Sequence, residues 1–479
     1  MKFVDRNGEI SSLRDAYSAK SSNLVIIYGR RRIGKTELAR HFGKEKSKCF
    51  AYYLCDESLF SEQLRRISIA VGEVIGDTEL MRMGAASLEA IFYKVSKTAS
   101  KKKFIIAIDE FPKLAKLDKA VPSTLQRAWD LYLKESGNLM LILSGSSISM
   151  MQDEALNYSS PLYGRSSLIF KLGQIGFRDI MLLAPKNLPN KDKLRLYFIF
   201  GGVPAYYSTM ASSIADYDNA SLLHIVSQLF NPGSVFSSEP NLLLSEEVKN
   251  DRVYLQILEL MSNGVNKPGE MASKAGVAHG NLAKYMGLLE SIGLVKKEFP
   301  VPMKFSRKSK TGVYSISDNF IDFYFGEMKK YMGTERAPQL VMDDLDLIAG
   351  RKFESLCREL VSDGAIGRYD IAGRWWGSNM RKSSGAREEE IDVVAVNSST
   401  KEALFAECKW SNRKVGIDVY ANLKRKSQFV EWHNSARKER FALFSREGFS
   451  DEMIDMAKRE KVLLFDVDAV LGLCKKHVE

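Results

Sequence analysis

Near its N-terminus the chain reads Leu24-Val25-Ile26-Ile27-Tyr28-Gly29-Arg30-Arg31-Arg32-Ile33-Gly34-Lys35-Thr36. The first five residues form an apolar run typical of a buried strand, and the remainder has the pattern GxxxxGK(S/T). Helix-forming residues follow without a break over positions 37–40. This order of strand, glycine-rich loop and helix is the context that a phosphate-binding P-loop requires. The alternative is a glycine-punctuated turn with no ligand.

The chemistry of a P-loop depends on a few of its residues. Gly29 and Gly34 let the backbone approach phosphates closely, where N–H groups and the positive end of the helix hold the anion. The Lys35 ammonium can reach the β- and γ-phosphates, and the Thr36 hydroxyl can bind Mg²⁺. The sequence therefore predicts ATP and Mg²⁺ as cofactors.

Two further apolar runs end in polar residues. Residues 103–108 are followed by Asp109 and Glu110, which is the Walker B arrangement. The first carboxylate can hold the Mg²⁺ shell, and the second can orient or deprotonate the attacking water. Residues 139–143 are followed by Ser144, a position where a sensor hydroxyl could contact the γ-phosphate. Strands that alternate with helices predict an α/β fold with a parallel sheet, and with the ligand at the carboxyl ends of the strands.

Length and composition limit the classes of protein that fit. With 479 residues, two to four domains are expected. No apolar run approaches the length of a bilayer span, and the first residues lack the apolar core of an export signal, so we expect a cytoplasmic protein without membrane contact. The five cysteines lack zinc spacing and are expected to be reduced thiols, and five histidines argue against a histidine-based metal site.

The chain is basic, with a net charge of +11. Lysine and arginine cluster at 101–103, 307–310 and 424–426. Such a balance favours a polyanionic partner, and nucleic acid is the first to consider, DNA before RNA. Ordinary solvated surface is the alternative for each cluster.

Several motifs together resemble a known family. They are Phe3, Arg6, Glu9 and Leu13, the loop GRRRIGKTEL, IDEFP, LSGSSISMM, PLYGR at 161–165 and GGVP at 201–204. In this order they resemble the archaeal-type ATPases, which belong to the STAND signalling ATPases within the AAA+-related P-loop class. The resemblance covers about residues 1–330.

The resemblance implies roles for individual residues. Glu110 is the expected catalytic base, with Lys35 and the cationic Arg165 at the phosphates, and Thr36 and Asp109 are expected to hold the metal. The nucleotide is expected to contact Gly29, Arg30, Arg31, Arg32, Ile33, Gly34, Lys35, Thr36, Glu37, Ser144 and Pro204. For Arg165 an ordinary surface arginine is the alternative, and for Pro204 a simple loop. Pro112 departs from the glutamine that many family members carry there.

The middle of the chain, at 245–330, has the order of a winged helix-turn-helix. Helical patterns at 253–261, about 268–272 and 279–291 are followed by strand patterns at 294–299 and 312–316. Three helices and a basic hairpin are the layout of this DNA-binding motif. Asn281 and Lys284 on the last helix, with Arg307, Lys308 and Lys310 on the wing, are the candidates for DNA contact. An intramolecular lid or a protein contact is the alternative.

The C-terminal part, at 340–479, is predicted to begin after an acidic loop at 342–346. A helix at 351–361 carries Glu354, and two strands carry Asp392 and the pair Glu407 and Lys409. Because side chains alternate along a strand, Glu407 and Lys409 share one face, which Asp392 on the adjacent strand can reach. Two carboxylates and a lysine can hold Mg²⁺ and activate water against a phosphodiester.

This part resembles the C-terminal domain of the same archaeal-type ATPase family, which has been grouped with the PD-(D/E)xK restriction-endonuclease-like fold, with Ile391 in place of the proline. The resemblance implies Glu354, Asp392 and Glu407 as ligands of Mg²⁺, or of Mn²⁺, and Lys409 as the catalytic lysine. An ion-pair cluster on a structural domain is the alternative.

Together these patterns predict an α/β chain in three parts. A P-loop ATPase domain with parallel sheet and helical lid occupies 1–240, a winged helix-turn-helix 245–330, and an α/β restriction-endonuclease-like domain 340–479. The predicted function is a Mg²⁺-dependent ATP-hydrolysing switch that acts on nucleic acid, with a phosphodiesterase site in the tail. A non-nucleolytic, ATP-controlled regulator that binds DNA or protein is the alternative. Homo-oligomerisation and a protein partner stay open.

Overall fold

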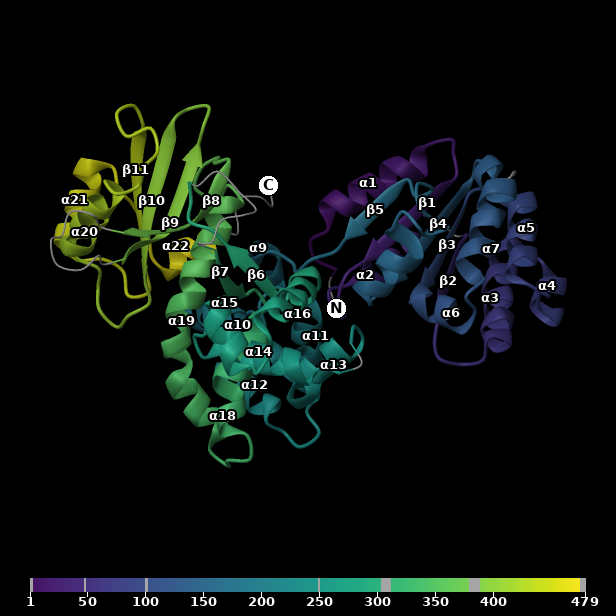
Figure 1. Cartoon of the computed structure of the whole chain (residues 1–479), viewed down its shortest axis with the longest axis horizontal. Helices are drawn as coiled ribbons and strands as arrows, with labels where there is room; N and C mark the ends of the chain where they lie inside the picture. The colour runs from purple at the N-terminus through teal and green to yellow at the C-terminus, as the bar shows by residue number, and fades with distance from the viewer. Residues whose placement is uncertain are drawn as a thin grey trace. The chain divides into compact units, whose positions relative to one another are not determined.

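The computed structural model describes residues 3–46, 49–99, 102–248, 250–302, 312–378 and 388–473. Its contacts divide the chain into two compact units (Figure 1). The first unit contains Met1–Gln174 and Asn241–Asp251, and the second contains Ile175–Pro240 and Arg252–Glu479. Residues 175–240, which the sequence predicts as part of the ATPase module, fall in the second unit. The predicted limits of the three domains stay a prediction.

The first unit is built on a five-stranded parallel sheet in the order β2-β3-β4-β1-β5. The strands are β1 (Asn23–Tyr28), β2 (Phe50–Leu54), β3 (Phe104–Asp109), β4 (Leu139–Gly145) and β5 (Leu168–Lys171). The helices are α1 (Asn7–Ser18), α2 (Lys35–Lys46), α3 (Phe60–Ile75), α4 (Thr78–Met83), α5 (Leu88–Ala99), α6 (Phe111–Leu117), α7 (Val121–Ala128) and α8 (Ile148–Met151). The three strands predicted from apolar runs are all present in this sheet.

Helices cover both faces of this sheet, as the unbroken apolar runs predict. Val25 and Ile27 of β1 pack in the core formed with α1 and α2. Leu24 and Ile26 of the same strand point to the opposite core, with α3, α5, α6 and α7. Since all strands are parallel, their carboxyl ends meet at one edge, and the P-loop and the segments that follow β3 and β4 leave from that edge.

The second unit begins with helices. They are α9 (Phe177–Ile180), α10 (Asn190–Phe200), α11 (Pro204–Ser213), α12 (Leu222–Leu229), α13 (Glu239–Ser245, which runs on into the first unit), α14 (Arg252–Ser262), α15 (Pro268–Lys274) and α16 (His279–Ser291). The antiparallel pair β6 (Val295–Glu298) and β7 (Val313–Ile316) follows, then α17 (Asn319–Phe323), α18 (Lys329–Tyr331) and α19 (Ala337–Ser362). Arg307, Lys308 and Lys310 lie outside the described residues.

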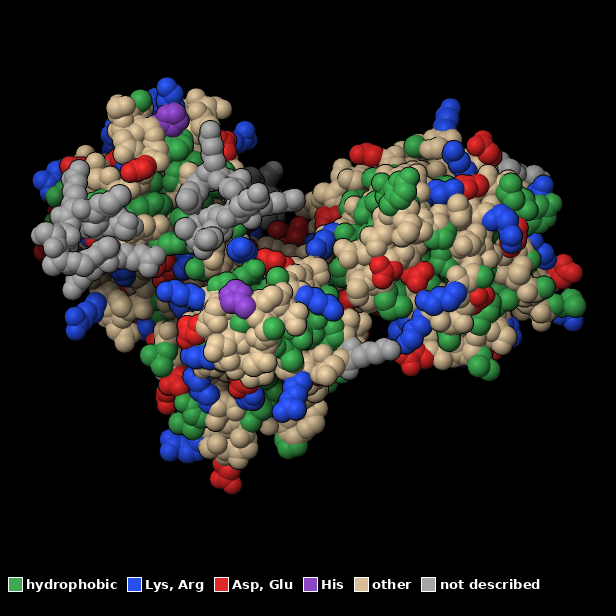
Figure 2. Space-filling model, viewed as in Figure 1, with side chains coloured by type: hydrophobic (Ala, Val, Ile, Leu, Met, Phe, Trp, Pro, Cys, Tyr) green, Lys and Arg blue, Asp and Glu red, His purple; other side chains and the backbone are tan. Residues whose placement is uncertain are grey.

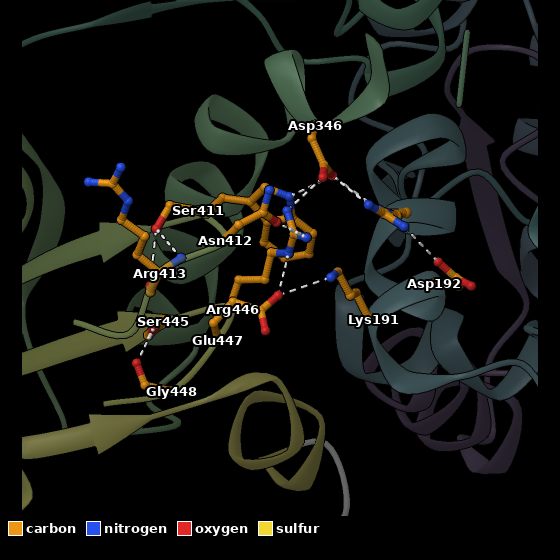
Figure 3. Close-up of polar contacts among 12 residues, drawn as sticks. Lys191, Asp192, Asp346, Ser411, Asn412, Arg413, Ser445, Arg446, Glu447 and Gly448 are labelled. Carbon is orange, nitrogen blue, oxygen red and sulfur yellow. Dashed lines mark hydrogen bonds and ion pairs between the residues drawn. The ribbon is translucent and has the colours of Figure 1, made fainter. Parts of the chain in front are cut away.

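One local prediction in this region was wrong. Residues 342–346 were expected to form an acidic loop, but they lie inside α19, a continuous helix of 26 residues. The acidic composition reflects a tertiary role. Asp346 accepts hydrogen bonds from Arg195 Nη2 at 2.8 Å, Trp410 Nε1 at 3.0 Å and Arg446 Nη1 at 2.6 Å (Figure 3).

The C-terminal part of this unit is a mixed five-stranded sheet in the order β12-β11-β10-β9-β8. Its strands are β8 (Ile371–Ser378), β9 (Glu388–Asn397), β10 (Glu402–Lys409), β11 (Lys438–Ser445) and β12 (Leu463–Phe465). β8, β9 and β10 are antiparallel neighbours, whereas β10, β11 and β12 run parallel. The helices α20 (Ile417–Ser427), α21 (Asp451–Glu460) and α22 (Val467–Gly472) accompany them, and α19 packs against β8, β9 and β10.

The face of the molecule drawn in Figure 2 shows no single dominant charge. On the face seen in Figure 2, lysine and arginine side chains are interspersed with aspartate and glutamate. The basic cluster at 424–426 is paired internally, because Lys424, Arg425 and Lys426 contact Glu460, Glu389 and Glu407 respectively. Across the described residues, no helix combines the length and apolar character of a membrane span.

Candidate nucleotide and metal sites

The loop between β1 and α2 has the backbone that close phosphate contact requires. Gly29 has φ +149°, and a Cβ placed there would stand 2.4 Å from the carbonyl oxygen of Leu172. Gly34 has φ +94°, and Arg32 has φ +71°, a conformation that costs a non-glycine residue energy. The loop is therefore held in a strained shape at the N-terminus of α2.

Arg6 supports this loop from the side. Its Nη2 donates to the carbonyl of Ile33 at 3.1 Å and to that of Gly173 at 2.6 Å. The guanidinium is buried and also pairs with Glu9. The resemblance had singled out Arg6 as a motif residue without a role. Its contact with Ile33 spans 27 positions and could not be read from local pattern.

Lys35 lies within the loop, only 5% exposed. Its Nζ donates to the carbonyl of Arg30 at 2.9 Å. Burial lowers the pKa of the Lys35 ammonium, and the carboxylates of Glu110 and Asp109 oppose that effect. The Lys35 ammonium is thus hydrogen-bonded to a neutral carbonyl. A phosphate oxygen can replace that carbonyl, because its hydrogen bond to the ammonium is charge-assisted and stronger.

Asp109 is the centre of a buried hydrogen-bond network. Its Oδ2 accepts from Thr36 Oγ1 at 2.6 Å and from the Tyr52 hydroxyl at 2.8 Å. Its Oδ1 accepts from Ser144 Oγ at 2.6 Å and from the Glu110 N–H at 3.1 Å. Burial, together with the charge of Asp109, raises the pKa of Tyr52, so this phenol remains a donor. Hard oxygens of Thr36 and Asp109 beside the loop are a donor set that fits Mg²⁺.

Glu110 has the left-handed conformation, φ +54°, at the start of α6. Its carboxylate is bound by Ser146, which donates from Oγ to Oε1 and from its N–H to Oε2 at 3.2 Å. Ser146 follows β4, two positions beyond Ser144. The expected base is therefore restrained by a residue that sequence analysis did not select.

The other predicted nucleotide residues are placed as follows. Arg31 pairs with Glu246 at 3.2 Å, and Glu37 is exposed in the first turn of α2. Arg165 donates to Asp130 from Nε at 2.9 Å and from Nη2 at 2.7 Å, so its charge is already paired. Pro204 begins α11 in the second unit. Pro112 lies buried in the first turn of α6. The nucleotide contacts of Arg31, Glu37, Arg165 and Pro204 stay predictions, and none is predicted for Pro112.

In the second unit, α19, β9 and β10 bring together the four residues predicted for the tail. The last residue pair between β9 and β10 is Val393 with Ala406. One residue beyond, Asp392 Oδ2 accepts from the Cys408 N–H at 2.8 Å. Lys409 Nζ donates to Glu407 Oε1 at 2.8 Å, as the shared strand face predicts.

Charge governs this cluster. Burial, and then the nearby Glu407 and Glu354 carboxylates, raise the pKa of Asp392 to about 7. Burial also raises the pKa of Glu354, while Arg358, at 3.8 Å, works against it. For Lys409 burial acts to lower the pKa, but Glu407 and Asp392 together raise it. The carboxylates of Glu407 and Glu354 thus repel the ionised form of Asp392.

Lys426 of α20 is a further member that sequence analysis missed. Its Nζ lies 3.2 Å from Glu407 Oε1 and 3.4 Å from Oε2, with only 13% of the side chain exposed. With Glu407 turned to two ammonium groups and Asp392 to a backbone N–H, no group of three or more His, Cys, Asp or Glu side chains in the described ranges is arranged to hold an ion. A metal at this position requires Glu407 to rearrange.

Comparison with known proteins defines the family. Residues 3–210 match a family described as an ATPase domain predominantly from Archaea, and residues 320–428 match one described as archaea bacterial proteins of unknown function. An uncharacterised protein of Methanocaldococcus jannaschii is 31% identical over 441 residues, which cover 89% of this chain and 92% of that protein. An uncharacterised ATP-binding protein of the same organism is 40% identical over 53 residues, 11% of this chain and 90% of that protein.

Among solved structures, the Walker-type ATPase of Pyrococcus abyssi aligns with a TM-score of 0.53 at 17% identity, over 67% of this chain and 96% of that one. This likeness concerns the fold. The chain belongs to the family in which the ATPase domain predominantly from Archaea is followed by a C-terminal domain of unknown function, here matched at residues 320–428. The predicted archaeal-type ATPase domain with its parallel sheet is thereby confirmed.

The raised pKa of Asp392 predicts a pH-dependent stability. In the folded chain the carboxyl keeps its proton to about pH 7, but in the unfolded chain it ionises near 3.8. The contribution of Asp392 to the free energy of unfolding is therefore greatest below pH 4 and is lost as the pH rises to 7. Asp392→Asn removes the titration, so its unfolding free energy relative to wild type should grow by on the order of 3–4 kcal/mol between pH 4 and 7. Urea unfolding across this range measures it, and parallel profiles for the two proteins would contradict it.

Proposed function

We propose that the chain is a Mg²⁺-dependent ATPase of STAND type that uses bound ATP as a conformational switch. The observation that carries this proposal is the network on Asp109, in which Thr36 of the P-loop helix and Ser144 of β4 meet one buried carboxylate. A structural turn has no need of a buried acid with three side-chain donors beside a buried lysine. A metal site does need these groups, because a metal ion can take the place of the hydrogen bond between hydroxyl and carboxylate and bind both oxygens.

The residues present can perform each part of the reaction. The N–H groups at the start of α2 bind phosphate oxygens, and Lys35 leaves the Arg30 carbonyl for the β- and γ-phosphates. Thr36 and Asp109 would hold Mg²⁺, which would supply charge stabilisation at the transferred phosphoryl group. Glu110, once released from Ser146, orients and deprotonates the attacking water.

Two variants separate binding from turnover. Lys35→Ala should weaken ATP binding by at least about tenfold, because it removes the buried ammonium of the loop. Glu110→Gln keeps the shape and should leave ATP affinity within about threefold while lowering kcat by about 100-fold or more. Lys44→Ala, at the far end of α2, is the control and should match wild type. Calorimetric ATP titration and phosphate release measure these effects, and equal turnover by wild type and Glu110→Gln would overturn the assignment of the base.

A second activity is proposed for the tail, a metal-dependent phosphodiesterase of restriction-endonuclease-like fold. Its support is the meeting of Glu354, Asp392 and Glu407 with Lys409 on three elements. Trp410, the residue after Lys409, donates to Asp346 and so anchors the end of β10 to α19. Asp392 and Glu407 would hold Mg²⁺ or Mn²⁺, and Lys409, with Lys426, would neutralise charge on the scissile phosphate.

The proposed substrate of that activity is nucleic acid, DNA first. The order α14, α15, α16, β6 and β7 supports a winged helix-turn-helix, and Asn281 and Lys284 are exposed on α16. None of the four cysteines in the described part of the chain forms a disulfide, which supports a cytoplasmic location. The competing proposal is an ATP-controlled regulator that binds DNA or a protein partner without cutting, alone or as a homo-oligomer, in which Lys426 and Lys409 serve as permanent counter-ions of Glu407.

Metal binding and cleavage distinguish these two proposals. Asp392→Ala should abolish cleavage of DNA in Mn²⁺ and leave ATP turnover unchanged, because the two sites lie in different units. Lys409→Ala should still bind Mn²⁺ by calorimetry but cut at least about 100-fold more slowly. Asp455→Asn, on the exposed helix α21, is the control. If the wild-type chain with ATP and Mn²⁺ leaves single- and double-stranded DNA and RNA intact, and calorimetry detects no Mn²⁺ binding that Asp392→Ala removes, the regulator proposal stands.

A further inference from the structure

Residues 241–251 leave the second unit, pack within the ATPase unit and return. Within this segment, the Glu247 side chain accepts four hydrogen bonds. Its carboxylate accepts from the N–H groups of Ile148 at 2.7 Å and Ser149 at 3.2 Å, and from the hydroxyls of Ser149 at 2.6 Å and Ser147 at 3.3 Å. One carboxylate with four donors binds the chain that directly follows Ser146.

Glu246, the preceding residue, faces the P-loop. It pairs with Arg31 Nη1 at 3.2 Å, and its side chain is 31% exposed. Burial raises the pKa of the Glu246 carboxyl, and the charges of Glu110 and Lys35 also act on it. The two adjacent glutamates thus contact both sides of the nucleotide site, the P-loop and the segment after β4.

Glu247 also connects to the catalytic base through consecutive residues. Ser146 binds both oxygens of the Glu110 carboxylate, and Ser147 and Ser149 bind Glu247. A segment held at both ends in this way has little freedom to release Glu110. The resting contacts of Glu110 and of Arg31 therefore depend on the same two residues of the 241–251 segment.

We propose that Glu246 and Glu247 form an acidic latch, which holds the nucleotide site in a resting state and is displaced by the phosphates of ATP. The proposal rests on the ATPase function and names its regulation. Glu246 forms an ion pair with Arg31, as an anionic phosphate would, so ATP and the latch compete for the same cation. Glu247 holds the segment that contains Ser146 in place, so Ser146 stays bound to Glu110. Glu110 is then not free to activate the attacking water.

The physical basis is repulsion between like charges in a partly buried site. Bound ATP brings several negative charges to Lys35 and Arg31, where Glu246 already contributes one. By thermodynamic linkage, the factor by which bound ATP weakens the latch contacts equals the factor by which the latch weakens ATP binding. Removing the Glu246 charge should therefore tighten binding, although the substitution deletes an ion pair.

The test compares single variants of the intact chain. Glu246→Gln should bind ATP with Mg²⁺ about 3–10-fold more tightly than wild type. In Glu247→Gln an amide donor faces the donors of Ile148 and Ser149, so the release of Glu110 should raise basal ATP turnover about 2–5-fold. Glu45→Gln is the matched control, since Glu45 also pairs with an arginine, Arg14, but at the far end of α2. Its affinity and turnover should stay within about twofold of wild type.

Hydrogen exchange of the wild-type chain provides a measurement that needs no variant. Amides at 241–248 and 147–149 should exchange faster with ATP and Mg²⁺ bound than without. Wild-type ATP affinity and turnover in both latch variants would overturn the latch, and so would unchanged or slower exchange of these amides on ATP binding. Failure of the wild-type chain itself to bind ATP would instead contradict the ATPase proposal.

Discussion

The buried carboxylate of Asp109 is the constraint on which the nucleotide unit depends. It accepts hydrogen bonds from Thr36, Tyr52 and Ser144, which come from α2, β2 and β4. The strand order makes this meeting necessary, since β3 lies between β2 and β4. A buried charge without these donors would cost several kcal/mol. The same network therefore stabilises the fold and positions the hydroxyl and the carboxylate that are proposed to hold Mg²⁺.

The two candidate sites satisfy their carboxylates in different ways. At the P-loop the donors are neutral hydroxyls, which a metal ion can displace without leaving a buried cation unpaired. In the tail, Glu407 is neutralised by the ammonium groups of Lys409 and Lys426. On the proposed functions, a metal at the P-loop would replace only hydroxyl hydrogen bonds, whereas a metal in the tail would require Glu407 to leave both lysines.

Sequence predicted those features that local pattern determines. The apolar runs at 24–28, 103–108 and 139–143 became neighbouring strands because continuous β-branched sequence favours a fully buried parallel strand. Asp392, Glu407 and Lys409 converged because period-two alternation fixes the face of a strand. The acidic residues at 342–346 misled, since composition cannot show that Asp346 meets Arg195 and Arg446, which are 151 and 100 positions away. Lys426, Ser146 and the latch glutamates escaped for the same reason, because only the folded chain brings them to their partners.

The most direct test of the switch is a structure of the intact chain with Mg²⁺ and a non-hydrolysable ATP analogue. The account predicts that Thr36 and Asp109 separate to hold the ion, that Lys35 leaves the Arg30 carbonyl for the phosphates, and that Glu246 leaves Arg31. A bound analogue with the Thr36–Asp109, Lys35–Arg30 and Arg31–Glu246 contacts all intact would contradict the claim that ATP controls this chain through its P-loop.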